Sequence, residues 1–270
     1  MGEAKLKQYS RRKFLETRPY CIYCGALATT TDHCPPRCCF QDRQWPEGYE
    51  FPACAVCNAA GRLDELLIGV LARMHLQQDL LPAAQAQWER LVRGLGNNRP
   101  ELVKELSSTS ATQTKRAMRR MFGPEGDRLR HEGWRVSTLG PLTLEAIDRF
   151  MVKLAQALYY HHLGRIFEGT IKTHHNSLFH QPADFFESIL TYMPDSANPR
   201  RGNKSLSDQF SYRYSYSDEL GALLAMVNFN PQLIFTFIAA SVGAVGAMVA
   251  AGDEGFRNSP RVTIVRLKQR

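Results

Sequence analysis

Apolar residues follow a helical period through much of the N-terminal half of the chain. Between residues 63 and 74 they recur at intervals of three and four and form one stripe, which predicts a helix running to about Leu80. Pro82 suits the first turn of a second helix, and Gly94 and Gly96 are expected to end it. These segments together predict a helical region.

The longest helical pattern runs from Leu142 to Leu163, with Thr143 as the expected N-cap. A shorter helix is expected from Pro100. Residues 115–122 place four basic side chains on one face of another helix. That face can lie along a nucleic-acid backbone or can simply face solvent.

After residue 208 the period changes to that of strands. Aromatic residues alternate with small and polar residues over 210–216, and 223–229, 233–240 and 261–267 are further β-compatible runs. The uncharged stretch 233–252 is twenty residues long, the length that spans a bilayer. Its richness in Ala, Gly and Ser favours a buried strand and helix, and a membrane segment is the alternative.

Two Cys-x-x-Cys pairs, Cys21/Cys24 and Cys54/Cys57, lie near the N-terminus. At this spacing a tight turn directs two thiolates toward one ion, so the two pairs supply the four sulfurs of a tetrahedral zinc site. The pairs therefore predict a structural zinc; the alternative is four buried or unpaired thiols.

The dipeptide Asp32-His33 lies between the pairs, and Asn58 directly follows the last cysteine. A carboxylate that holds Mg²⁺ beside an imidazole that takes a proton from water is the combination needed for metal-assisted hydrolysis. Asn58 is expected to reach the same centre, because the second cysteine turn fixes its direction.

The order Cys-x-x-Cys, Asp-His, Pro, Cys-x-x-Cys-Asn resembles the zinc-bearing HNH endonucleases over about residues 18–65. The resemblance implies an α+β fold, with a ββα-metal module of one hairpin packed on one helix. It implies structural zinc at the cysteine pairs and a catalytic Mg²⁺ or Mn²⁺ held by Asp32 and Asn58. His33 would be the general base that activates water against a phosphodiester bond.

The middle polar residue of the family, usually Asn, is missing, and Tyr49 and Glu50 are the nearest candidates. The family's Lys after the Asn on the helix is also absent: Ala59, Ala60 and Gly61 come first. The competing hypothesis is therefore a zinc module that has lost cleavage and binds nucleic acid or protein.

The organisation expected is a basic arm over 1–18, the zinc module over 19–81, and a helical then β-rich region over 82–270. The net charge of +8 and the pI near 9.2 favour an anionic partner, and nucleic acid, DNA rather than RNA, is the partner expected. Arg37 and Arg43 can contact phosphate or simply form soluble surface.

The remaining cysteines are Cys34, Cys38 and Cys39, which either compete for zinc or serve as small buried apolar residues. The odd cysteine count of seven and the lack of an N-terminal apolar run favour a reducing cytoplasm. Several histidines lie close together in the sequence, and we expect them to be ordinary surface or core residues and not the ligands of a second metal site. They are His161, His162, His174, His175 and His180.

Overall fold

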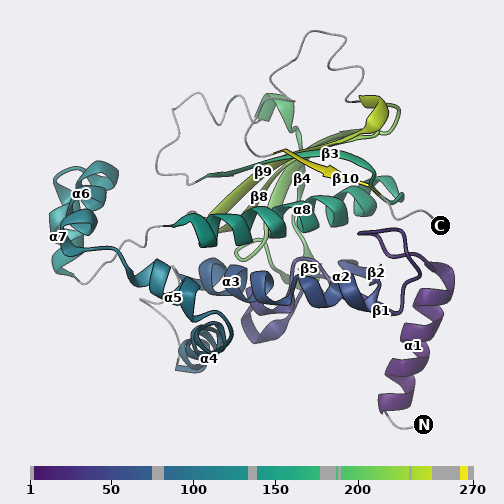
Figure 1. Ribbon diagram of the computed structural model, residues 1–270, viewed down its shortest axis with the longest axis horizontal. Coiled ribbons are helices and arrows are strands. Elements are labelled where there is room, and N and C mark those ends of the chain that lie inside the picture. Colours follow the sequence, from purple (N-terminus) through teal and green to yellow (C-terminus); the bar gives the residue numbers. More distant parts are fainter. Residues whose placement is uncertain are drawn as a thin grey trace.

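The computed structural model describes residues 3–74, 82–132, 139–176, 187, 190–230, 233–244 and 262–266. Three layers are stacked within them (Figure 1). A six-stranded sheet forms the first layer and helix α8 (Pro141–Leu163) the second. A small hairpin with α2 (Ala55–Ala60) and α3 (Arg62–Arg73) forms the third. One cluster of buried apolar side chains runs through all three layers, and the mixed helix and sheet content confirms the broad fold class.

The six-stranded sheet is antiparallel throughout, in the order β10-β3-β9-β8-β7-β4. Its strands are β3 (Gly169–Asn176), β4 (Asp195–Ala197), β7 (Ser211–Ser217), β8 (Ala222–Asn230), β9 (Leu233–Ser241) and β10 (Val262–Val265). The four predicted β-runs correspond to β7, β8, β9 and β10, because alternation of side chains across a strand leaves a period of two in the sequence. A separate two-stranded ribbon pairs β5 (Arg200–Arg201) with β6 (Lys204–Ser205).

The uncharged stretch begins as an inner strand. β9 pairs with β3 on one side and with β8 on the other, and most of its residues are buried. Residues 245–252 of the stretch lie outside the described part of the chain. None of the helices in the described part is long and apolar enough to cross a bilayer.

Helix α8 is covered on two sides. Phe150 packs against Phe229 and Phe235 of the sheet, with ring centroids 6.2 and 6.0 Å away. On another side the amide of Gln156 donates to the backbone carbonyl of Tyr23 in the zinc region (3.1 Å). α8 therefore connects the sheet to the N-terminal layer.

The start of α8 differs from the prediction. Gly140 is the N-cap and Pro141 the first helical residue, whereas Thr143 lies buried inside the first turn. The carboxylate of Glu105 accepts from the backbone N–H groups of Leu142 and Thr143 (3.1 and 2.7 Å). A side chain from another helix thus does the capping, which local sequence rules do not reveal.

Helix α4 (Pro82–Asn98) is longer than predicted, because it continues through Gly94 and Gly96. Leu95 between the glycines is buried, and an added Cβ at Gly94 would meet Leu66 of α3 at 3.7 Å. Packing therefore outweighs the cost of about 1 kcal/mol for each helical glycine.

The end of α3 and the helices outside the three layers complete the described helical part of the fold. α3 ends at Arg73, short of the predicted Leu80, and residues 75–81 lie outside the described part of the chain. α5 (Pro100–Ser107) follows α4 as predicted. α6 (Ala111–Phe122), α7 (Glu125–His131) and α1 (Glu3–Thr17) lie at opposite ends of the molecule (Figure 1).

Leu154→Ala in α8 is expected to lower the free energy of unfolding by about 2–5 kcal/mol, since it opens a cavity in a fully buried position. Leu142→Ala is the matched control, because Leu142 on the same helix is 41% exposed; it should change stability by less than about 0.5 kcal/mol. Urea-induced unfolding measures both, and equal effects would contradict the placement of α8.

Candidate functional site

Two tight turns position the four cysteines. In the first, Gly25 adopts a φ of 73° and its N–H donates to the carbonyl of Cys21 (2.9 Å). In the second, Cys54 is the N-cap of α2, where its sulfur accepts from the N–H of Cys57 (3.4 Å). Each turn directs its two sulfurs to the same side.

The four sulfurs lie within 4.8 Å of one another, and Cys24 Sγ is 3.7 Å from Cys54 Sγ. A tetrahedron with zinc–sulfur bonds of about 2.3 Å has sulfurs about 3.8 Å apart. All four cysteines are free thiols, so none is committed to a disulfide. The predicted arrangement of four cysteines around one metal position is confirmed, and its spacing is consistent with structural zinc.

The acidity of these thiols fits the same conclusion. Hydrogen bonding from Cys57 lowers the pKa of Cys21 to about 5, and the same contact raises the pKa of Cys57. Close thiols thus share one proton, because two adjacent thiolates repel each other. A bound divalent cation is what allows all four sulfurs to be thiolates at this spacing.

The other cysteines do not join this group. Cys34 and Cys39 are buried, and the Cys38 thiol contacts the carbonyl of Glu65 (3.2 Å). In the described part of the chain the four-cysteine group is the only metal-ligating cluster of Cys, His, Asp and Glu. His180 lies outside the described residues.

The hairpin of β1 (Thr30–His33) and β2 (Glu50–Ala53) carries the Asp-His dipeptide. Neighbouring residues of a strand point to opposite faces, so Asp32 faces the interior and His33 faces the long connecting loop. Asp32 is 4% exposed. α2 follows this hairpin directly.

The carboxylate of Asp32 is engaged by three donors. Oδ2 accepts from the hydroxyl of Tyr23 (2.7 Å) and pairs with Nζ of Lys153 on α8 (2.7 Å), and Oδ1 accepts from the N–H of His33 (2.9 Å). Lys153 also bonds Glu65 of α3. Burial alone would lower the pKa of Lys153, but the two carboxylates outweigh burial and raise it, so the ammonium is charged.

Asn58 lies on α2 beside the same hairpin. Its amide nitrogen donates to Thr30 Oγ1 (3.1 Å) and to the carbonyl of Thr31 (3.2 Å). Asn58 therefore ties the helix to β1 within one residue of Asp32. In this arrangement its amide has a structural use that requires no ion.

His33 is surrounded by polar and aromatic groups. Its Nε2 is 2.8 Å from Glu50 Oε1 and 2.8 Å from Arg37 Nη2, and its ring meets Trp45 edge-on at 4.6 Å. One ring nitrogen cannot both donate to a carboxylate and accept from a guanidinium, so the tautomer selects the contact. Hydrogen bonding to His33 lowers the pKa of Glu50.

The structure adds two residues to the site. Glu50 is opposite His33 in the hairpin, at the position where the family's middle polar residue was sought. Lys153 was missed, although it is the one charged residue between Phe150 and Tyr160, and a lone charge in an apolar helical stretch indicates a buried partner.

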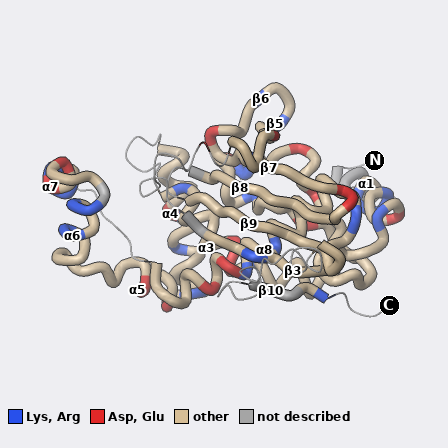
Figure 2. Tube along the Cα trace, turned by 90° about the horizontal axis from the view of Figure 1, so that it is seen from above, with Lys and Arg blue, Asp and Glu red and all other residues tan. Residues whose placement is uncertain are grey.

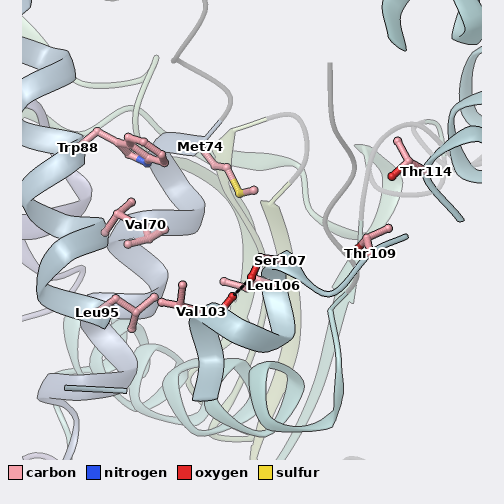
Figure 3. Close-up of a pocket in the computed structure, with 10 residues that line it drawn as sticks. Val70, Met74, Trp88, Leu95, Val103, Leu106, Ser107, Thr109 and Thr114 are labelled. Carbon is pink, nitrogen blue, oxygen red and sulfur yellow. Dashed lines mark hydrogen bonds between the residues drawn. The ribbon is translucent and has the colours of Figure 1, made fainter. Parts of the chain in front are cut away.

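The largely apolar cavity in Figure 3 is separate from this site. It has a volume of about 440 Å³ and is lined by residues of α3, α4, α5 and α6 and their connections. Labelled residues include Val70, Met74, Trp88, Leu95, Val103 and Leu106. None of the predicted site residues lines it.

Comparison with known proteins finds no protein-family model, no curated protein and no solved structure that matches this chain. The resemblance to HNH endonucleases therefore depends on the motif residues alone. The four-cysteine metal position is the part of it that the structure supports.

Cys24→Ser is expected to remove zinc from the purified chain, reducing the content from about one ion per chain to near zero, because three sulfurs remain for a four-coordinate site. Cys38→Ala is the matched control, since Cys38 lies outside the cluster, and should retain the ion. Elemental analysis measures both; equal zinc in the two variants would contradict the assignment of the site.

Lys153→Met should lower the free energy of unfolding by about 3–5 kcal/mol, because it leaves Asp32 buried without its cation. Asp32→Asn combined with Lys153→Met should recover a large part of this loss. Urea-induced unfolding at equal zinc content measures both. A single variant as stable as the native chain would show that the pair is not a buried ionic contact.

Proposed function

We propose that this chain is a zinc-stapled, HNH-like module that binds nucleic acid and does not use Asp32 for metal-dependent cleavage. The observation that carries the proposal is the ion pair between Asp32 and Lys153. An ammonium stands beside the carboxylate that the family would offer to a divalent cation.

The contacts of Asp32 do not fit Mg²⁺ or Mn²⁺. Binding a cation there requires displacing a buried ammonium that already neutralises the carboxylate. It would also require a hydrated ion to reach a carboxylate that is 4% exposed, whereas Mg²⁺ gives up its waters reluctantly. Asn58, the second expected ligand, holds the hairpin through its amide.

Charge supports an anionic partner. The net charge is +8, and Lys and Arg are found on α1 at one end of the molecule and on α6 at the other (Figure 2). The arginines of α7 pair with acidic residues and add no net charge. Arg37 adds a guanidinium beside His33. Nucleic acid is the polyanion that such positive charge attracts over a long range.

Metal-dependent endonuclease activity is the second candidate. The contact between Glu50 and His33 favours it, because a carboxylate that orients an imidazole is a common partner of a general base. In that case Asp32 would have to exchange the Lys153 ammonium for the ion, whereas Asn58 would offer its amide oxygen and could keep the hydrogen bonds of its amide nitrogen. The two functions therefore differ in whether the carboxylate of Asp32 pairs with Lys153 or binds a metal ion.

One experiment tests both functions on the full-length, zinc-loaded chain. Fluorescence anisotropy with labelled single-stranded DNA, duplex DNA and RNA should detect binding that weakens at least about tenfold between 50 and 200 mM salt, as expected when several phosphates are contacted. With Mg²⁺ or Mn²⁺ added, supercoiled plasmid and single strands should stay intact.

The Asp32→Asn and His33→Ala variants are assayed beside the native chain at equal zinc content. Cleavage by the native chain that both variants lose would overturn the proposal in favour of the endonuclease. Absence of binding to all three nucleic acids at low salt would overturn the nucleic-acid function itself.

A further inference from the structure

Two arginines from distant parts of the chain stack on one tryptophan. The guanidinium carbon of Arg37 lies 3.8 Å, and that of Arg201 4.0 Å, from the ring centroid of Trp45. Arg37 begins a short 3₁₀ turn in the loop between β1 and β2, and Arg201 belongs to the β5–β6 ribbon. Two cations are thus held together on one aromatic ring beside His33.

Neither arginine is neutralised by a direct carboxylate partner. Among the described residues no Asp or Glu forms an ion pair with Arg37 or Arg201, in contrast to Arg149, which pairs with Asp64 through two 2.8 Å contacts. Burial lowers the pKa of Arg37, with Arg43 and Arg201 adding to the effect and Glu50 opposing it. The two guanidiniums therefore repel each other with no carboxylate paired to either, and a bound anion would reduce the repulsion.

The donors of these arginines are largely unused. Nε of Arg37 is buried and has no hydrogen-bond partner, and Nη2 has the contact with His33. Arg201 uses Nη1 for the carbonyl of Trp45 (3.1 Å). Each planar guanidinium still has N–H groups to offer in the fork geometry that matches a phosphate.

Two hydrogen bonds hold the loop that contains Trp45 against the β5–β6 ribbon. Glu47 donates its N–H to the carbonyl of Arg200 (2.9 Å), and the carboxylate of Glu47 accepts from the N–H of Gly202 (3.0 Å). The ribbon that carries Arg201 is therefore fixed to the loop that carries Trp45. A site whose two cations are held in this way needs little rearrangement to bind an anion.

We propose that Arg37 and Arg201, stacked on Trp45, form a phosphate clamp that binds a phosphodiester of the nucleic-acid backbone. The inference rests on the proposed function and assigns it a place on the molecule. Glu47 and Glu50 are the acidic neighbours, and Arg43 adds a third positive charge on the same side. The clamp is complete only when the zinc-module loop and the C-terminal ribbon are together.

The test uses the double variant Arg37→Gln/Arg201→Gln of the full-length, zinc-loaded chain, with a labelled 20-nucleotide single strand as the probe. Affinity should fall at least about tenfold, and the plot of log affinity against log salt should become shallower by about 0.7, the contribution of one phosphate of a single strand. The control Arg93→Gln/Lys104→Gln on exposed positions of α4 and α5 removes the same charge and should change affinity less than about twofold.

A second variant, Arg37→Lys/Arg201→Lys, keeps the charge but removes the planar forks. It should bind more weakly than the native chain at equal zinc content and equal melting temperature. This comparison separates a clamp from general positive charge, and it keeps the test valid if the glutamine variant folds poorly.

The outcomes separate the two proposals. If the native chain binds the strand and the clamp variants bind equally well, the clamp is wrong while the proposed function stands. If the clamp variant and the Arg93/Lys104 control lose the same affinity, diffuse charge explains binding and the clamp is again wrong. If the native chain fails to bind any nucleic acid, both proposals are overturned.

Discussion

The ammonium of Lys153 is the contact on which the N-terminal layer depends. It lies between the buried carboxylate of Asp32 and that of Glu65, so one positive charge from α8 contacts an acidic group from β1 and another from α3. Separating the helix from the hairpin would leave these charges unpaired in a poorly solvated place, at a cost of several kcal/mol. The zinc turns fix the hairpin internally, and Lys153 fixes it to the rest of the molecule.

This contact also changes how the HNH-like motif is understood. Asp32, His33 and Asn58 of the motif are present, but the carboxylate of Asp32 pairs with Lys153 and the amide nitrogen of Asn58 donates to β1. His33 points to the other side of the strand, toward Glu50, Arg37 and the loop between β1 and β2. The interior side of the hairpin therefore belongs to the core, whereas His33 and Arg37 lie on its other side.

The outer face is built from segments that are far apart in the sequence. Trp45 in the zinc-module loop receives guanidiniums from its own loop and from the β5–β6 ribbon, and backbone hydrogen bonds hold the two segments together. Stacking on an aromatic ring positions arginine without neutralising it, which a carboxylate would do. This arrangement of two arginines on one ring exists only when the loop and the ribbon are together.

The sequence alone determined the cysteine turns, the strands β7, β8 and β9, and the existence of the main helices, because these features depend on residues close together in the chain. Two thiols three residues apart share a turn, and side-chain period follows backbone geometry. Tertiary structure decided that α4 continues through Gly94, that Glu105 caps α8, and that Lys153 meets Asp32. These outcomes depend on which distant groups come together when water is excluded, and the residues next to each group in the sequence do not identify its partner.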